Sequence, residues 1–261
     1  MTFELSPEHE QFRRSVRDFA EKEIAPHAAQ WDREHHFPTD VVQKMGKLGL
    51  MGLTAPEEFG GAGMAGEDGS PEISAIVIPS GTPGFTVEKP YEKLGWHASD
   101  THPLSFENCR VPESNLLGKR GRGYAQFLSV LDDGRVAIAA LAVGCIQACL
   151  DMSLQYAGER QTFGVPIGRK QGVAFQLADL EVMLQASRVL TYQAAAVAKL
   201  YATESAVTAT RIATQVFGGY GFMEEYPVVR FYRDAKVLEI GEGTSEVQRM
   251  LIARGLGLPV E

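Results

Sequence analysis

The most constraining feature of the sequence is a stretch without glycine or proline that covers residues 173–217. As a single helix it would be about 65 Å long, at 1.5 Å of rise per residue. A compact domain of this size is narrower than that. We therefore expect two antiparallel helices here, although the sequence lacks the usual connecting turn. Either an extended helix exchanged between subunits or a local break near residues 196–203 would resolve the conflict.

The rest of the chain predicts helices on both sides of a short β region. Ser6 followed by Pro7 is a typical helix start, and Thr39 begins another short helix that Gly49 ends. The β-branched runs at 72–80, 84–89 and 104–112 predict strands, separated by glycine and proline. A further helix is expected over about 124–158.

Composition and charge exclude several classes of function. A chain of 261 residues can form one large domain or two smaller ones, and its net charge of −8 with scattered basic residues argues against nucleic-acid binding. No run of eighteen apolar residues is present, so we expect no transmembrane helix. The start "MTFELSPEHEQFRRSVRDF" lacks a signal-peptide core and contains acidic residues. We therefore expect a cytoplasmic protein that does not bind a membrane.

The three cysteines predict neither a disulfide nor a metal site. Cys145 and Cys149 have the i, i+4 spacing of one helix face, and Cys109 lies elsewhere. No further cysteine or histidine cluster offers a third or fourth metal ligand near them. Reduced, mostly buried thiols are the expected state.

Glu242 occupies an unusual position within "KVLEIGEGTSEVQRMLIARG", residues 236–255. It lies between two glycines, after an apolar run and before a helix for which Ser245 and Gln248 predict a capping box and Gly255 the end. From this context alone a solvated surface acid is one interpretation. The flexible glycines favour a second, the close approach of a ligand.

Several motifs resemble the FAD-dependent acyl-CoA dehydrogenases. They are "YAGERQTFG", "QVFGGYGF", "YRDAKVLEIGEGTSEVQRMLIARG" and "KLGWHASDT…FENCRVP", and the segment "IAPHAAQWDREHHFP…GLMGLTAPEEFGGAG" is similar to the family's opening helices. The resemblance implies a mainly α fold, with an N-terminal helical segment (1–63), a remnant of the middle β-domain (64–118) and a C-terminal helical bundle (119–261). Family members are longer. Segments that they have are absent here between Gly63 and about Glu72, and near residues 196–199.

The resemblance implies that Glu242 is the catalytic base. The family removes the α-proton of an acyl-CoA thioester while a hydride leaves the β-carbon for the flavin, and its base is the glutamate of a Tyr-Glu-Gly-Thr motif. Here Gly241 replaces the tyrosine. Some members carry the base at the position matching Gly134, which cannot serve. The other interpretation of Glu242 is a surface loop acid.

Substrate-binding residues are implied in two places. The segment "LDDGR" resembles the family's substrate-binding stretch, although it could equally be the solvated acidic face of an amphipathic helix. The implied substrate-binding residues are Asp132, Asp133, Gly134, Arg135 and Gly243.

Cofactor contacts are implied at three places. Arg160 suits a pyrophosphate because a guanidinium offers paired donors, and in the family it reaches the flavin nucleotide of a neighbouring subunit. Its alternative role is to neutralise the helix end. The Gly-Gly turn after residue 217 could simply end a helix, and Glu246 could be an ordinary first-turn acid. The implied cofactor-binding residues are Arg160, Thr162, Phe163, Gln171, Gln215, Val216, Phe217, Gly218, Gly219, Thr244, Ser245 and Glu246.

Other side chains receive structural interpretations. His97 stands where the family usually has a basic residue, and we interpret it as an ordinary loop histidine. Phe217 and Tyr220 are expected to pack in the core, as is Phe163, except that Phe163 also lies inside the predicted cofactor loop.

The predicted function is therefore FAD-dependent oxidation of a saturated acyl-CoA to the 2-enoyl-CoA. An electron-transfer flavoprotein is the expected oxidant, and the cross-subunit contacts imply a homotetramer or homodimer. The alternative is a non-catalytic helical assembly remnant whose flavin site is incomplete. A deacylating or oxygen-reducing relative of the same fold is a third option.

Overall fold

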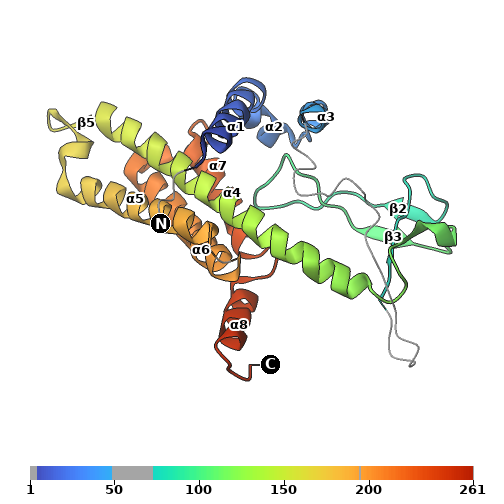
Figure 1. Cartoon of the computed structure of the whole chain (residues 1–261). Helices are drawn as coiled ribbons and strands as arrows, with labels where there is room; N and C mark the ends of the chain where they lie inside the picture. Colours follow the sequence, from blue (N-terminus) through green and yellow to red (C-terminus); the bar gives the residue numbers. More distant parts are fainter. Residues whose placement is uncertain (1–4, 49–72, 194, 261) are drawn as a thin grey trace. The chain divides into compact units, whose positions relative to one another are not determined.

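The computed structural model describes residues 5–48, 73–193 and 195–260, apart from the side chain of Asp132. It is mainly helical, with 65% helix and 7% strand, which confirms the expected fold class. The chain divides into two compact units, Met1–Ser129 and Val130–Glu261, which are described separately (Figure 1). The three segments expected from the sequence have different boundaries from these units and stay a prediction.

The first unit begins with short helices. They are α1 (Pro7–Phe19), which continues as the π-helix η1 (Ala20–Ile24), then α2 (Ala28–Glu34) and α3 (Thr39–Lys47). The Ser6 hydroxyl accepts a hydrogen bond from the backbone N–H of His9 (3.3 Å), which confirms the predicted cap. Lys44 on α3 pairs with Glu23 of η1 at 2.6 Å. Gly49, the predicted end of α3, lies outside the described residues.

The β region of this unit consists of two small antiparallel ladders. Strands β1 (Ala75–Ile76) and β4 (Leu116–Leu117) form one, with the 3-10 turn η2 (Glu113–Asn115) before β4, and β2 (Phe85–Val87) and β3 (Leu104–Phe106) form the other. All three predicted strands are present but much shorter than the apolar runs that indicated them. The strand β4 was not predicted.

His97 lies in a loop, as interpreted, and this loop is tied to α2 through its side chain. Its Nδ1 lies 3.3 Å from a carboxylate oxygen of buried Asp32 on α2, and its Nε2 lies 3.0 Å from the Lys93 carbonyl oxygen. Its ring stacks on that of His35, with 4.4 Å between centroids. The loop before β3 is thereby joined to the end of α2.

The second unit is a helical bundle whose first members are long. Helix α4 (Gly123–Glu159) leads into the hairpin β5 (Gln161–Thr162) and β6 (Val165–Pro166), the 3-10 turn η3 (Ile167–Arg169), and helices α5 (Gln171–Thr191) and α6 (Ala195–Phe217). Helices α5 and α6 pack on each other, and α4 lies alongside them (Figure 1). The predicted limits of α4 are confirmed to within one residue.

The stretch without glycine or proline therefore forms two antiparallel helices, as expected. They pack within one chain, so neither a single extended helix nor an exchange between subunits is present. The predicted break at residues 196–203 was wrong, because α6 is continuous there. Instead the chain leaves α5 after Thr191, where the N–H groups of Tyr192 and Gln193 bond to carbonyls three residues back.

Helix α6 is the centre of the bundle. It contacts α5, the 3-10 turn η4 (Gly218–Phe222), α7 (Pro227–Ala235), the 3-10 turn η5 (Lys236–Glu239) and α8 (Ser245–Gly255). Five alanines on α6 have no exposed surface, and their spacing of three or four residues places them on one side of the helix. They are Ala198, Ala202, Ala206, Ala209 and Ala213.

The start of α8 differs from the predicted capping box. Thr244 has an extended backbone (φ −60°, ψ 166°), and its hydroxyl accepts from the N–H of Val247 at 3.4 Å. Ser245 is already helical, and the amide of Gln248 bonds elsewhere. At the other end Gly255 is the last helical residue, and the left-handed glycine is Gly257 (φ +83°).

Helix α4 contains two of the three cysteines and is also long and apolar. Cys145 and Cys149 are free and buried on α4, and Cys109 is free and half-buried, as expected. By length and composition α4 could cross a membrane, although no transmembrane helix was predicted. The core helix of a soluble protein passes the same test, so this is weak evidence.

Candidate active site

Glu242 lies in a tight loop between η5 and α8. Its φ of +53° is in the left-handed region that residues with a side chain seldom adopt, and Gly243 follows at +89°. The side chain is half-buried. A Cβ atom built on Gly134 of α4 would stand 2.5 Å from Oε2 of Glu242. The carboxylate therefore packs directly against α4 at Gly134, a position where the helix has no side chain.

Two fully buried side chains bond to the backbone of this loop. The ammonium of Lys199 on α6 donates to the carbonyls of Glu239 (3.2 Å) and Gly243 (2.8 Å). The amide of Gln248 on α8 donates to the carbonyls of Glu242 (3.2 Å) and Gly243 (3.1 Å). Burial lowers the pKa of Lys199, and the charges of Glu239 and Glu242 oppose this shift in part.

The predicted substrate-binding residues are only partly brought together. Gly134 and Gly243 lie at the Glu242 loop, one beside the carboxylate and one next in the chain. Arg135 is buried on α4, and Asp133 is exposed. The side chain of Asp132 is outside what the structure describes. Substrate contact by these residues stays a prediction.

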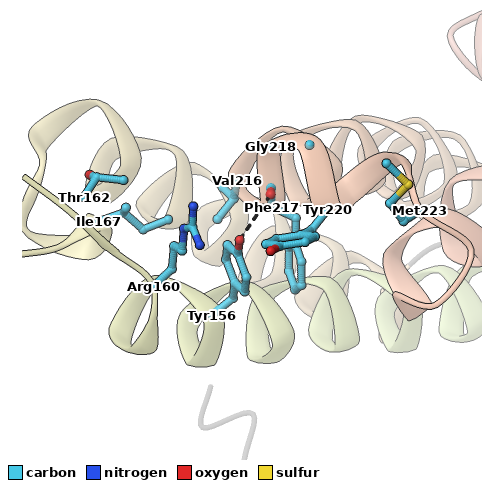
Figure 2. Close-up of a pocket in the computed structure, with 10 residues that line it drawn as sticks. Tyr156, Arg160, Thr162, Ile167, Val216, Phe217, Gly218, Tyr220 and Met223 are labelled. Carbon is cyan, nitrogen blue, oxygen red and sulfur yellow. Dashed lines mark hydrogen bonds between the residues drawn. The ribbon is translucent and has the colours of Figure 1, made fainter.

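A cavity of about 480 Å³ lies at the opposite end of α6 (Figure 2). It is formed by the end of α4, the β5–β6 hairpin, η3 and the junction of α6 with η4. Six of the predicted cofactor-binding residues line it: Arg160, Thr162, Val216, Phe217, Gly218 and Gly219. Its other lining residues are Tyr156, Ile167, Tyr220 and Met223.

The chemistry of this cavity combines a cation, aromatic rings and open backbone. The guanidinium of Arg160 lies 5.6 Å from the centre of the Tyr220 ring, and no carboxylate of the described residues pairs with it. A Cβ on Gly218 or Gly219 would have no atom within 4 Å, so a ligand can approach the backbone there. Anions bind to arginine forks and to exposed backbone N–H groups.

Aromatic packing supports the floor of the cavity. The rings of Tyr156 and Phe217 stack with 4.1 Å between centroids, and the Tyr156 hydroxyl donates to the Phe217 carbonyl at 3.4 Å (Figure 2). Burial raises the pKa of Tyr156. Phe217 is 7% exposed, which confirms the core prediction, but Tyr220 is 44% exposed and faces the cavity, so for Tyr220 that prediction was wrong.

Six predicted cofactor-binding residues do not line this cavity, and three of these are Phe163, Gln171 and Gln215. Phe163 is at the tip of the β5–β6 hairpin, with a φ of +53° and 97% exposure, which rules out core packing for it. The Lys170 ammonium lies 5.0 Å from the centre of the Phe163 ring. Gln171 begins α5, and Gln215 is on an exposed face of α6.

The remaining predicted contacts lie at the start of α8. Thr244, Ser245 and Glu246 line a separate cavity of about 160 Å³, together with Glu204, Lys236, Glu239 and Ile240. The backbone N–H of Glu246 and the Thr244 hydroxyl lower the pKa of Glu246. This is the bonding expected of a first-turn helix acid. Glu242 lines neither this cavity nor the larger one at Arg160.

Sequence reasoning missed the side chains that support the site. One feature of the sequence could have indicated Lys199, because it is a charged residue inside the apolar run "AAAVAKLYA". Tyr156 lies four residues before Arg160 and therefore on the same helix face, which could have placed it at the cavity. Gln248 had been assigned to a cap, and nothing local indicated Ile167 or Met223.

Comparison with known proteins identifies the relatives of this chain. Residues 121–257 match the acyl-CoA dehydrogenase C-terminal domain, and residues 6–70 match the N-terminal domain. The probable acyl-CoA dehydrogenase YngJ of Bacillus subtilis (strain 168) is 35% identical, covering 98% of this chain and 100% of that protein. That alignment runs over 378 residues, so this chain, at 261, is shorter than its relative.

Solved structures show the same relationship. Butyryl-CoA dehydrogenase from Megasphaera elsdenii has a TM-score of 0.90 at 26% identity, covering 99% of this chain and 100% of that one. An electron transferring flavoprotein structure of Acidaminococcus fermentans also has a TM-score of 0.90, at 27% identity, covering 98% and 99%. The two domain matches, the helical bundle and the Bacillus relative agree, and we conclude that this chain belongs to the acyl-CoA dehydrogenase family.

Proposed function

We propose that this protein oxidises a saturated acyl-CoA to the 2-enoyl-CoA, with Glu242 as the base. The observation that carries the proposal is the position of the Glu242 carboxylate, half-buried in a strained loop and packed against Gly134 of α4. Strained backbone conformations are concentrated at functional sites. The names of the relatives supply the substrate class, an acyl thioester of coenzyme A.

Family members are FAD-dependent flavoproteins, and the cavity at the far end of α6 fits part of that cofactor. Arg160 would hold a phosphate, the lack of side chains at Gly218 and Gly219 leaves room for the cofactor, and Tyr220 offers a face to a planar ring. When bound, FAD supplies an acceptor for the hydride that leaves the β-carbon of the substrate. Because the family's assemblies are homo-oligomers, we propose that this cavity serves the cofactor of a neighbouring subunit.

The chain's own chemical contribution is proton removal. A C–H bond next to a thioester is far less acidic than a carboxylic acid, so proton abstraction depends on close and correct placement of the base. A carboxylate oxygen of Glu242 would take the α-proton. Two features hold this side chain in place: the left-handed backbone of the loop and the contact of the carboxylate with α4.

A second candidate function is a non-catalytic helical assembly protein. The difference in length favours it, because the chain lacks more than a hundred positions of the alignment with YngJ. The resemblance implies that the segments absent between Gly63 and about Glu72 include the family's flavin-contact segment. An electron-transferring flavoprotein is the acceptor that we propose for the enzyme, and it has no role under this alternative.

Flavin content and dye reduction distinguish the two. The enzyme should purify yellow, with flavin near one per chain, and butyryl-CoA should reduce a dye acceptor in its presence. Glu242→Gln should keep the flavin and lose turnover, whereas Glu181→Gln, on the exposed face of α5, should keep both. A colourless protein that neither binds added FAD nor turns over butyryl-CoA would establish the assembly protein instead.

A further inference from the structure

Two fully buried polar side chains hold the backbone on both sides of Glu242. Lys199 and Gln248 each have 0% exposure, and together they donate four hydrogen bonds to three backbone carbonyls, those of Glu239, Glu242 and Gly243. The Gly243 carbonyl accepts from both of them. We call Lys199 and Gln248 the carbonyl clamp.

The stability of the fold does not explain a charged residue at position 199. Lysine is almost never fully buried unless it is paired with a carboxylate. As far as the described residues go, the hydrogen-bond partners of Lys199 are two carbonyl oxygens and no carboxylate lies at ion-pair distance. Taking a charge out of water carries a desolvation penalty, and even buried ion pairs can often be replaced by apolar side chains of similar volume with a neutral or stabilising effect. The ammonium therefore costs stability that an apolar residue would not.

The loop, however, needs such donors. Glu242 has a left-handed backbone that persists only when its surroundings over-determine it. Lys199 bonds the last carbonyl of η5 and the carbonyl that follows Glu242, so it joins the two ends of the loop. Gln248 bonds the carbonyl of Glu242 itself. With both donors in place, the backbone of Glu242 is held where its carboxylate contacts Gly134 of α4.

We propose that Lys199 and Gln248 are positioning residues, which fix the backbone of Glu242 so that its carboxylate is held at α4. The catalytic part of this inference rests on the proposed function. The structural part does not, because it concerns the loop of the protein as purified.

Amide hydrogen exchange tests the structural part. Lys199→Met and Gln248→Leu each remove the donors while keeping similar volume, and Thr210→Val is the matched control. Thr210 is also fully buried on α6, but its hydroxyl bonds only to its own helix, at the Val207 carbonyl (2.8 Å). We expect amides of residues 240–248 to exchange at least about tenfold faster in both clamp variants, and at the wild-type rate in the control. Unchanged exchange in both clamp variants would overturn the proposal, and Gln248→Leu decides it alone if Lys199→Met fails to fold.

Turnover of butyryl-CoA tests the catalytic part. Each clamp variant should lower kcat by about 10- to 100-fold with KM changed far less, because the base is misplaced while the substrate still binds. The double variant should lose little more than either single one, since the two donors share the Gly243 carbonyl. Thr210→Val should turn over normally.

The two possible failures have different signatures. If Glu242→Gln keeps wild-type turnover, or the wild type has none, the proposed function is wrong, and hydrogen exchange still decides whether the clamp exists. If Glu242→Gln is inactive while both clamp variants keep wild-type kcat, the positioning role is wrong and the proposed function stands.

Discussion

Replacing Gly134 with alanine would press a methyl group into the carboxylate of Glu242. The new Cβ would stand 2.5 Å from Oε2 and 2.8 Å from the carboxyl carbon, whereas ordinary contact begins at 3.4 Å. The carboxylate must therefore retreat by about 0.9 Å. A misplacement of about 1 Å can cost roughly 100-fold in rate, so kcat for an acyl-CoA should fall by about that factor.

The same substitution should not harm the fold. Alanine is favoured over glycine inside a helix by about 0.8–1 kcal/mol. The obstructing atoms belong to the end of a flexible side chain, which can move aside. We expect the Tm to stay level or to rise by about 2–4 °C. A variant that is at least as stable and yet much less active would show that the contact serves catalysis.

The measurement pairs differential scanning calorimetry with dye-linked turnover of butyryl-CoA. Gly144→Ala is the matched control, because Gly144 is on the same helix and a Cβ there would have no atom within 4 Å. It should gain similar stability and keep full activity. Turnover of Gly134→Ala within about threefold of wild type would refute the reasoning that the carboxylate acts from its position at α4.

Three further predictions follow from the same structure. Gly243→Ala would place a Cβ on a backbone with a φ of +89°, only 2.9 Å from the buried amide nitrogen of Gln248. The free energy of unfolding, measured by chemical denaturation, should therefore fall by about 1–3 kcal/mol. A thiol reagent at pH 8 should modify Cys109 in the native protein but not Cys149, because the hydrogen bond between Cys149 and buried Cys145, together with burial, raises the pKa of Cys149. Rapid labelling of Cys149 in the native protein would contradict this. Burial lowers the pKa of Lys199 from 10.5, so the unfolded chain binds this proton more tightly than the folded one. The free energy of unfolding of wild type, relative to that of Lys199→Met, should therefore rise as the pH increases toward 10.5. A difference that stays flat or falls with pH would count against this.

Much of the helical framework was predictable because its signals are local. The cap at Ser6 and the limits of α4 follow from residues within one or two turns of the helix ends. The turn after Thr191 has no such signal. Tyr192 and Gln193 form it by bonding back to the preceding helix, and neither is a typical turn residue.

The candidate site was predictable only where a motif marked it. The motifs indicated Glu242 and Arg160; the structure places Glu242 against Gly134 and Arg160 in the lining of the larger cavity, and their catalytic and cofactor roles stay predictions. The clamp residue Lys199 is 43 positions from the base, and its contact depends on how closely α6 approaches the η5–α8 loop. The distance between α6 and this loop depends on how the helices pack on one another, and the periodicity of a single segment does not predict it.

The five fully buried alanines on one side of α6 limit how this protein could be redesigned. Each of these five positions already has the smallest side chain that a good helix former offers, and none has exposed surface. A larger residue at any one of them would push neighbouring backbones apart and lower the free energy of unfolding by typically about 1–3 kcal/mol. In a randomised library these sites should accept almost no replacement except glycine or serine, while exposed positions one residue away accept many. Tolerance along α6 should therefore repeat every three to four residues, and attempts to broaden the site would do better to vary α4.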